Sequence, residues 1–204
     1  MHVASVGRAQ PGGSMTVRTI ATATVLLLTL PLLAAAQDAT TYRVLATNKT
    51  STMHKEMQQA GEAGFRFVAV MGGETSFGGK EVVVLMQKIP NGQPLEYRLL
   101  ATSKTSTMQK ELQEAGDAGF EFVGQTVFES LLGGKEVAAI LQRDPSAPAK
   151  QRFEYKLIAT KKTSTLQKEL VEVGEQGFQA IGMTVAETAI GGGELVVITR
   201  RALK

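Results

Sequence analysis

Three segments of the chain repeat one order of apolar and polar residues. The segments that begin at Tyr42, Tyr97 and Tyr155 read YRVLATNKTSTMHKEM, YRLLATSKTSTMQKEL and YKLIATKKTSTLQKEL, with nine of the sixteen positions identical in all three. The β-branched and aromatic residues of the first six positions predict a strand. The alignment continues without a gap to a Gly-Phe pair in each copy. This self-similarity indicates tandem copies of one module.

A helix is predicted after the first strand of each copy. In the first copy, Met53, Met57 and Ala60 lie at positions i, i+4 and i+7, which gives the helix one apolar face. Gly64 is expected to end this helix in the left-handed conformation, and the phenylalanine after it opens the second strand. The predicted N-cap residues are Ser51, Ser106 and Ser164, and capping boxes are expected with Gln109 and Gln167.

The last strand of each copy is apolar on both faces. Residues 82–86 and 137–141 are five consecutive apolar residues, and residues 195–198 are four. Successive side chains of a strand point to opposite faces, so the helix of the same copy covers only one face. The other face must meet a second sheet, another copy or another chain. A module of about fifty residues also needs such support, because its burial and chain entropy nearly cancel.

These patterns predict an α+β protein with three tandem βαββ modules, each a helix packed on a small, mostly antiparallel sheet. The modules are placed at residues 41–89, 96–144 and 153–202, and proline-containing linkers at 89–94 and 144–148 separate them. We expect the modules to pack together into one body. A closed pseudo-threefold arrangement and an open one both fit the sequence.

The N-terminal region has the parts of a secretory signal peptide. Arg18 precedes an apolar stretch at residues 20–33, and small residues ending at Ala36 follow it. We therefore place a signal peptide at residues 1–36, with translation expected to start at Met15 and cleavage after Ala36. The exported protein would reside in the periplasm or the medium, with no membrane span after cleavage.

Composition restricts the available chemistry. After residue 36 the chain has 20 basic and 19 acidic residues, so no concentrated basic face for nucleic acid is expected. The absence of cysteine excludes disulfides, thiolate metal sites and a thiol nucleophile. His54 is the one histidine after residue 36. We expect neither an enzyme nor a cofactor or metal site.

The order of first strand, short helix and Gly-x-x-Gly-Phe run resembles a small bacterial family, domain of unknown function 4177. The matching runs read GFRFV, GFEFV and GFQAI at residues 64–68, 119–123 and 177–181, with phenylalanine where that family typically has tryptophan. The resemblance covers nearly all of the chain after residue 36, three times. It implies a helix-on-sheet fold, no known activity and no functional residue.

A Lys-Thr-Ser-Thr run stands at the start of each predicted helix. Free backbone N–H groups, hydroxyls and a lysine together could hold a small anion. Ordinary capping beside a solvated lysine explains the same residues. The candidate anion-binding residues are Lys49, Ser51, Lys104, Ser106, Lys162 and Ser164.

The hairpin loops of the three copies share a Glu-[Thr/Ser]-x-[Phe/Leu/Ile]-Gly-Gly sequence. Three glutamates brought together could bind a hard cation such as calcium, or take part in acid–base chemistry. Separate, exposed turn residues are the alternative. The candidate interaction residues are Glu74, Glu129, Glu187, Phe77, Leu132 and Ile190.

Three hypotheses about function follow. The first is an exported, non-enzymatic protein for protein interaction or envelope structure, with a protein partner or self-association. The alternative is a binding protein for a small anion, cation or glycan that uses the repeated loops or helix N-termini. The third is an enzyme, for which the repeated glutamates and lysines are the available acid–base groups.

Overall fold

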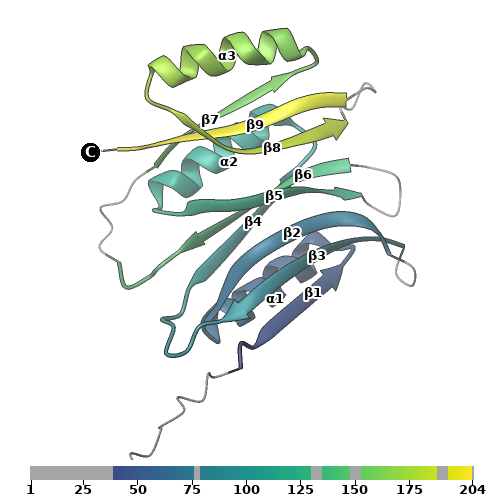
Figure 1. Ribbon diagram of the computed structural model, residues 1–204, viewed down its shortest axis with the longest axis vertical. Coiled ribbons are helices and arrows are strands. Elements are labelled where there is room, and N and C mark those ends of the chain that lie inside the picture. Colours follow the sequence, from purple (N-terminus) through teal and green to yellow (C-terminus); the bar gives the residue numbers. More distant parts are fainter. Residues whose placement is uncertain (1–38, 76–78, 130–134, 148–152, 188–192, 204) are drawn as a thin grey trace, which may run out of the picture. The chain divides into compact units, whose positions relative to one another are not determined.

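The computed structural model describes most of the chain after residue 38. The described residues are 39–75, 79–129, 135–147, 153–187 and 193–203. The predicted signal peptide therefore lies outside this part. The described residues form three small antiparallel sheets and three helices (Figure 1). The predicted α+β class is confirmed.

The elements follow one another as strand, helix, strand and strand in each copy. The first copy contains β1 (Tyr42–Thr47), α1 (Thr50–Glu62), β2 (Phe65–Thr75) and β3 (Gly79–Lys88). The second contains β4 (Glu96–Thr102), α2 (Thr105–Asp117), β5 (Glu121–Glu129) and β6 (Lys135–Arg143). The third contains β7 (Phe153–Thr160), α3 (Thr163–Glu175), β8 (Gln179–Glu187) and β9 (Gly193–Ala202). In the first, second and third sheets, the last strand of the copy lies between the other two and pairs antiparallel with both.

The helices begin before the serines that were predicted to cap them. The N-cap residues are Lys49, Lys104 and Lys162, and Ser51, Ser106 and Ser164 are the second helical residues. The N-cap prediction is therefore wrong. A threonine at the end of the first strand sets the turn instead. The Oγ1 atoms of Thr47, Thr102 and Thr160 accept the N–H of these three lysines at 3.1, 3.1 and 3.4 Å.

A glycine ends each helix in the left-handed conformation, as predicted. The φ angles are 78°, 82° and 83° at Gly64, Gly119 and Gly177. Any other residue would be strained at such a φ angle, so glycine sets the direction of the chain into the second strand.

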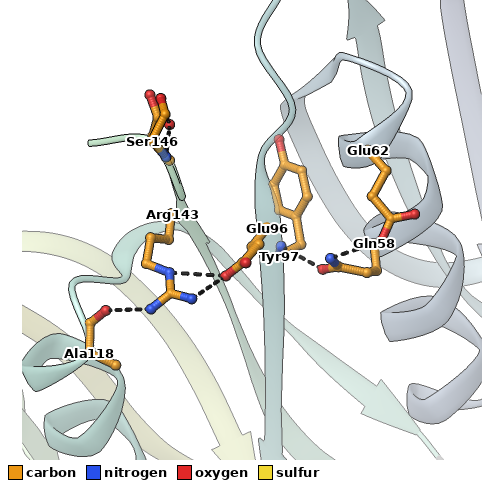
Figure 2. A network of polar contacts seen from close by, with 8 residues as sticks. Gln58, Glu62, Glu96, Tyr97, Ala118, Arg143 and Ser146 are labelled. Atoms are coloured by element: carbon orange, nitrogen blue, oxygen red, sulfur yellow. Dashed lines mark hydrogen bonds and ion pairs between the residues drawn. The ribbon is translucent and has the colours of Figure 1, made fainter. Parts of the chain in front are cut away.

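A cation from the last strand of each sheet fastens the end of its own helix. Arg143 Nη1 donates a hydrogen bond to the carbonyl oxygen of Ala118 at 3.0 Å, and its Nε donates to Glu96 at 2.9 Å (Figure 2). The guanidinium also lies 4.7 Å from the ring centroid of Phe120. Positive charge is favourable there, because the last carbonyl groups of a helix carry partial negative charge. The corresponding contacts in the other copies join Lys88 to Ala63 and Arg201 to Gln176.

The last strands show how far the two faces of each sheet are covered. In the second sheet every residue from Val137 to Leu141 is buried, and in the third sheet Val196–Thr199 are buried. In the first sheet burial alternates along β3, with Val84 buried but Val83 and Leu85 only half-buried. Within the described residues, the second and third sheets therefore have both faces covered, and the first sheet has one face covered.

The helices α1 and α2 each pack between their own sheet and the next one. Met57 on α1 shares one core with Val84 of the first sheet and Ile140 of the second. On α2, Leu112 shares another core with Leu141 of the second sheet and Ile198 of the third. The third core joins Leu166 and Val173 on α3 to Ile158 and Val197 of the third sheet and to Phe178, which precedes β8. The preceding helix is thus what covers the second face of the second and third sheets.

We expect Arg143→Met to lower the free energy of unfolding by about 1–3 kcal/mol, because it removes the charged hydrogen bond at the end of α2 and leaves Glu96 without its partner. Urea denaturation followed by circular dichroism measures this loss. Lys110→Met is the matched control, because Lys110 forms an exposed pair with Glu114 at 3.8 Å. Such pairs contribute less than about 1 kcal/mol. Equal losses in the two variants would contradict a role for Arg143 at the helix end.

Candidate functional site

One tyrosine lies at the centre of each contact between a helix and the next sheet. Tyr97 on β4 and Tyr155 on β7 are both 2% exposed. Their hydroxyl oxygens accept the backbone N–H groups of Phe67 and Phe122, each at 2.8 Å. Both donors lie at β-bulges, where the ladder register shifts and regular strand pairing is interrupted. We call this contact, in which a tyrosine satisfies a donor of the preceding sheet, a tyrosine junction.

A glutamine of the preceding helix binds the outer edge of the tyrosine's strand. Gln58 Oε1 accepts the N–H of Tyr97 at 2.9 Å, and Gln113 Oε1 accepts the N–H of Tyr155 at 3.2 Å. Figure 2 shows Gln58 between Tyr97 and Glu62, whose carboxylate accepts the Gln58 Nε2 group at 3.3 Å. Because β4 and β7 are edge strands, these bonds pair an N–H that the sheet itself leaves open.

Gln109 binds the same strand one turn earlier on α2. Its Nε2 donates to the carbonyl oxygen of Tyr155 at 2.9 Å, and its Oε1 accepts the N–H of Leu157 at 2.7 Å. The capping box predicted with Gln109 is therefore wrong, because this side chain pairs with β7 and not with the start of its own helix. His54 stands at the corresponding position of α1.

A helical glycine lets the helix approach the tyrosine ring. A Cβ atom at Gly61 would lie 2.3 Å from the carbonyl oxygen of Leu95 and 2.7 Å from Cδ2 of Tyr97. One at Gly116 would lie 2.3 Å from the carbonyl oxygen of Phe153 and 2.9 Å from Cδ2 of Tyr155. All four distances are well inside van der Waals contact. Glycine costs about 1 kcal/mol relative to alanine inside a helix, and the junction explains why it is present.

A second glycine receives a phenylalanine ring from the preceding sheet. A Cβ atom at Gly124 on β5 would lie 2.6 Å from Cζ of Phe67, and one at Gly182 on β8 would lie 2.6 Å from Cζ of Phe122. The missing side chain therefore makes room for the ring and lets neighbouring sheets come close together.

Ion pairs also join neighbouring sheets. Arg200 of the third sheet lies 2.7 Å from Glu121 of the second. Lys80 of the first sheet donates a hydrogen bond to Glu129 of the second, which holds the pKa of that carboxyl below its usual range. Glu129 is one of the predicted interaction residues, and its partner in the structure is a lysine of the neighbouring sheet.

Tyr42 of the first sheet corresponds to Tyr97 and Tyr155, but no helix within the described part of the chain packs against it. Tyr42 is 56% exposed, and the register of β1 and β2 on β3 places Val44, Met71, Val83 and Leu85 on the same face. The corresponding faces of the second and third sheets are buried under α1 and α2. We call these five residues the open sheet face.

The helix side of a tyrosine junction has no partner on the third copy among the described residues. Gly174 on α3 corresponds to Gly61 and Gly116, yet no described residue lies within 4 Å of a Cβ atom built on it. The α3 residues Gln167 and Val171 lie on the same side of the helix by their 3- and 4-residue spacing. Ala180, Met183 and Val185 on β8 are also exposed. We call this surface the open helix face, and it comprises Gln167, Val171, Gly174, Ala180, Met183 and Val185.

Exposed apolar side chains concentrate on these two faces. The described residues include eight large apolar side chains that are exposed, and six of them belong to the open sheet face or the open helix face. Those six are 52–66% exposed: Tyr42, Val44, Met71, Val171, Met183 and Val185. Such clustering marks interaction surfaces, whereas scattered exposed apolar residues do not.

The predicted anion-binding residues lie at the helix starts as exposed side chains. They are Lys49, Ser51, Lys104, Ser106, Lys162 and Ser164. A pocket beside Lys104 and Thr105 has a volume of about 20 Å³, which is close to that of one water molecule. This pocket is therefore too small for a phosphate or sulfate ion.

The predicted loop residues fall partly outside the described residues. Phe77, Leu132 and Ile190 lie outside them, and Glu74 and Glu187 are described only as the backbone of β2 and β8. Glu129 pairs with Lys80. In the part of the chain that the structure describes, no three His, Asp or Glu residues form a group that could hold a metal ion. Of the helices seen there, none has the length and apolar character that crossing a bilayer requires.

Comparison with known proteins adds no assignment. No family model matches the chain, and neither a curated protein nor a solved structure matches it.

Sequence reasoning did not identify the tyrosine junction. The signal was present, because the Gly-x-x-Gly-Phe run keeps a first glycine inside the helix of every copy, at Gly61, Gly116 and Gly174. Only the second glycine of that run is needed to end the helix. A repeated helical glycine without a turn to make indicates close contact with another element.

Gly116→Ala and Gly174→Ala should change stability in opposite directions. The first places a methyl group against Tyr155 and should lower the free energy of unfolding by about 1–3 kcal/mol. The second adds a methyl group in open space and should raise it by up to about 1 kcal/mol through helix propensity. Urea unfolding of dilute protein measures both. A loss at Gly174 equal to that at Gly116 would show that the two positions do not differ in packing.

Alkaline pH should destabilise the fold through the two buried tyrosines. Burial raises the pKa of Tyr97 and Tyr155 above the usual value near 10, whereas the same phenols in the unfolded chain ionise near pH 10. Stability is therefore complete below pH 10 and falls as the pH rises beyond it. In thermal unfolding at pH 8–11.5, the double variant Tyr97→Phe/Tyr155→Phe should show a shallower loss. Tyr42→Phe, at an exposed position, is the control, and identical slopes in both variants would contradict this account.

Proposed function

We propose that this protein is an exported, non-enzymatic interaction protein, in which three tandem βαββ modules pack into one body and the open faces bind a protein partner. The single observation that carries the proposal is the open sheet face. It has the tyrosine and apolar residues of a tyrosine junction, but no described residue covers it as α1 and α2 cover the other two sheets.

The chemical character of the open faces supports a protein as partner. Terminal units of repeat proteins usually need a polar outer surface to remain soluble. Here Tyr42, Val44 and Met71 at one end and Val171, Met183 and Val185 at the other are apolar and exposed. Exposed apolar side chains of this size gain free energy when another surface covers them, by about 25 cal/mol per Å².

The available side chains support a role without catalysis. The chain has no cysteine and, after residue 36, one histidine, His54, which is exposed on α1. The charged groups at the junctions pair with one another, as in Lys80–Glu129 and Arg200–Glu121. The resemblance to domain of unknown function 4177 stays a prediction and implies no activity.

The export part of the proposal rests on the N-terminal sequence. Arg18, the apolar stretch at 20–33 and the alanines ending at Ala36 are the parts of a signal peptide. Its removal would leave only a few residues before Tyr42 on β1, so the open sheet face would be accessible in the periplasm or the medium. A role in envelope structure would follow from the same faces.

A photo-reactive amino acid at position 44 tests the proposal in the cells that export the protein. Position 44 lies in the open sheet face, so illumination should produce a covalent adduct with a protein partner. The same group at position 55, which is exposed on α1 outside both faces, should give no adduct. A third variant carries the group at position 171, in the open helix face. The proposal is wrong if positions 44 and 171 both give no more adduct than position 55.

A further inference from the structure

We propose that the partner is a second copy of this chain, docked so that the open helix face of one copy covers the open sheet face of the next. This inference rests on the proposed function and identifies the occupant of the open faces. The open helix face corresponds to the helix side of the internal tyrosine junctions, and the open sheet face corresponds to the tyrosine side. One further junction of the same kind therefore joins two chains.

The helical glycine of α3 lacks the contact that its counterparts make. At Gly61 and Gly116 a Cβ atom would collide with the tyrosine of the next sheet, whereas no described residue lies within 4 Å of the Cβ position at Gly174. Glycine in a helix costs stability relative to alanine, and no contact among the described residues offsets that cost. The ring of Tyr42 from a second copy occupies this space in the proposed contact, as Tyr155 does at Gly116.

The open helix face keeps the hydrogen-bonding groups that bind the next sheet in the internal junctions. Gln167 stands at the α3 position of Gln109, which binds both Tyr155 and Leu157 of the next sheet. Its amide therefore meets the carbonyl of Tyr42 and the N–H of Val44 in the second copy. Because Ala180 lies at the β-bulge of β8, its N–H corresponds to the bulge donors that bind the other two tyrosine hydroxyls.

Two residue differences between the open faces and the internal junctions compensate each other. Inside the chain a phenylalanine ring faces a glycine, as Phe122 faces Gly182, and a Cβ at that glycine would lie 2.6 Å from the ring. The phenylalanine corresponds to Ala180 of the open helix face, and the glycine corresponds to Ala69, which pairs with Leu85 beside the open sheet face. The methyl group of Ala69 would collide with a phenylalanine, but the small side chain of Ala180 leaves room for it. The two alanines therefore fit one another.

One hydrogen bond of the internal junctions has no counterpart in the contact between two chains. Val171 stands where Gln58 and Gln113 accept the N–H of a tyrosine. In the contact between two chains, apolar burial of Val171 replaces that bond. No covalent linker holds the two chains together. The proposed association is therefore reversible and depends on concentration, unlike the junctions inside the chain.

The geometry determines the kind of assembly. Each copy contributes a different surface to the contact, which makes the interface heterologous. In an open assembly, a heterologous interface leaves one sheet face and one helix face uncovered at the ends, so further copies can add until the chain closes into a ring. The contact therefore produces rings or open chains of increasing length, whereas an isologous contact stops at a dimer.

Blocked variants of the exported protein test this arrangement. Tyr42→Asp places a charge in the open sheet face, and Gly174→Lys places a long charged side chain in the open helix face. Sedimentation velocity over a range of concentrations should show wild-type protein growing in mass. Either variant alone should lose self-association by about tenfold or more, as expected for a central interface residue. Leu203→Asp, at an exposed apolar residue outside both faces, is the control and should assemble like wild type.

Mixing the two blocked variants gives the decisive result. Tyr42→Asp retains its helix face and Gly174→Lys retains its sheet face, so the mixture should form a one-to-one dimer that grows no further. Circular dichroism and thermal unfolding of each variant confirm that both remain folded. A dimer of Gly174→Lys by itself would indicate sheet-to-sheet pairing and overturn the proposal.

Two outcomes separate this inference from the proposed function. A wild-type protein that stays monomeric at every concentration, while position 44 crosslinks to a different protein, would refute the second copy as partner but retain the interaction role. A monomeric protein without any adduct from positions 44 and 171 would refute both. A position-44 adduct with the mass of two chains, lost in Gly174→Lys, would support both.

Discussion

A central strand that is apolar on both faces needs two covers, and one helix can provide only one of them. In β6 every side chain from Val137 to Leu141 is buried, because α2 covers one face and α1 covers the other. In β3 the second cover is missing from the described residues, and Val83 and Leu85 remain half-buried. Since the apolar area removed from water is the main favourable term in folding, this requirement explains why each small sheet is joined to a neighbour.

Two kinds of contact meet this requirement, one within each copy and one between copies. Within a copy, a cation such as Arg143 ties the last strand to the end of the helix and to the phenylalanine that follows it. Between copies, Tyr97 or Tyr155 reaches back to a bulge of the preceding sheet, while glycine removes the side chain that would keep the helix away. The contact at the helix end joins the helix and sheet of one copy, and the tyrosine junction joins that copy to the next one along the chain.

A protein held together in this way has stability that resembles a sum of unit terms and nearest-neighbour terms. Its two terminal surfaces then matter more than in a protein with one central core, because each is half of a contact that the interior completes. Tyr42 and Gly174 show this most directly. Their equivalents in the middle of the chain, Tyr97, Tyr155, Gly61 and Gly116, are buried or closely packed, whereas Tyr42 and Gly174 are exposed.

Local residue patterns were sufficient to predict the α+β class, the helix-ending glycines and the burial of both faces of β6 and β9, because strand alternation and the backbone demands of glycine act over a few residues. They did not identify Lys49, Lys104 and Lys162 as the N-cap residues, or show that Gln109 binds β7, since these outcomes depend on which of several nearby polar partners the folded chain presents. The three equivalent tyrosines lie in nearly the same local sequence, but their exposed fractions range from 2% at Tyr97 and Tyr155 to 56% at Tyr42. Only the tertiary structure decided which of them meets a preceding helix, because burial depends on the neighbour and not on the residue itself.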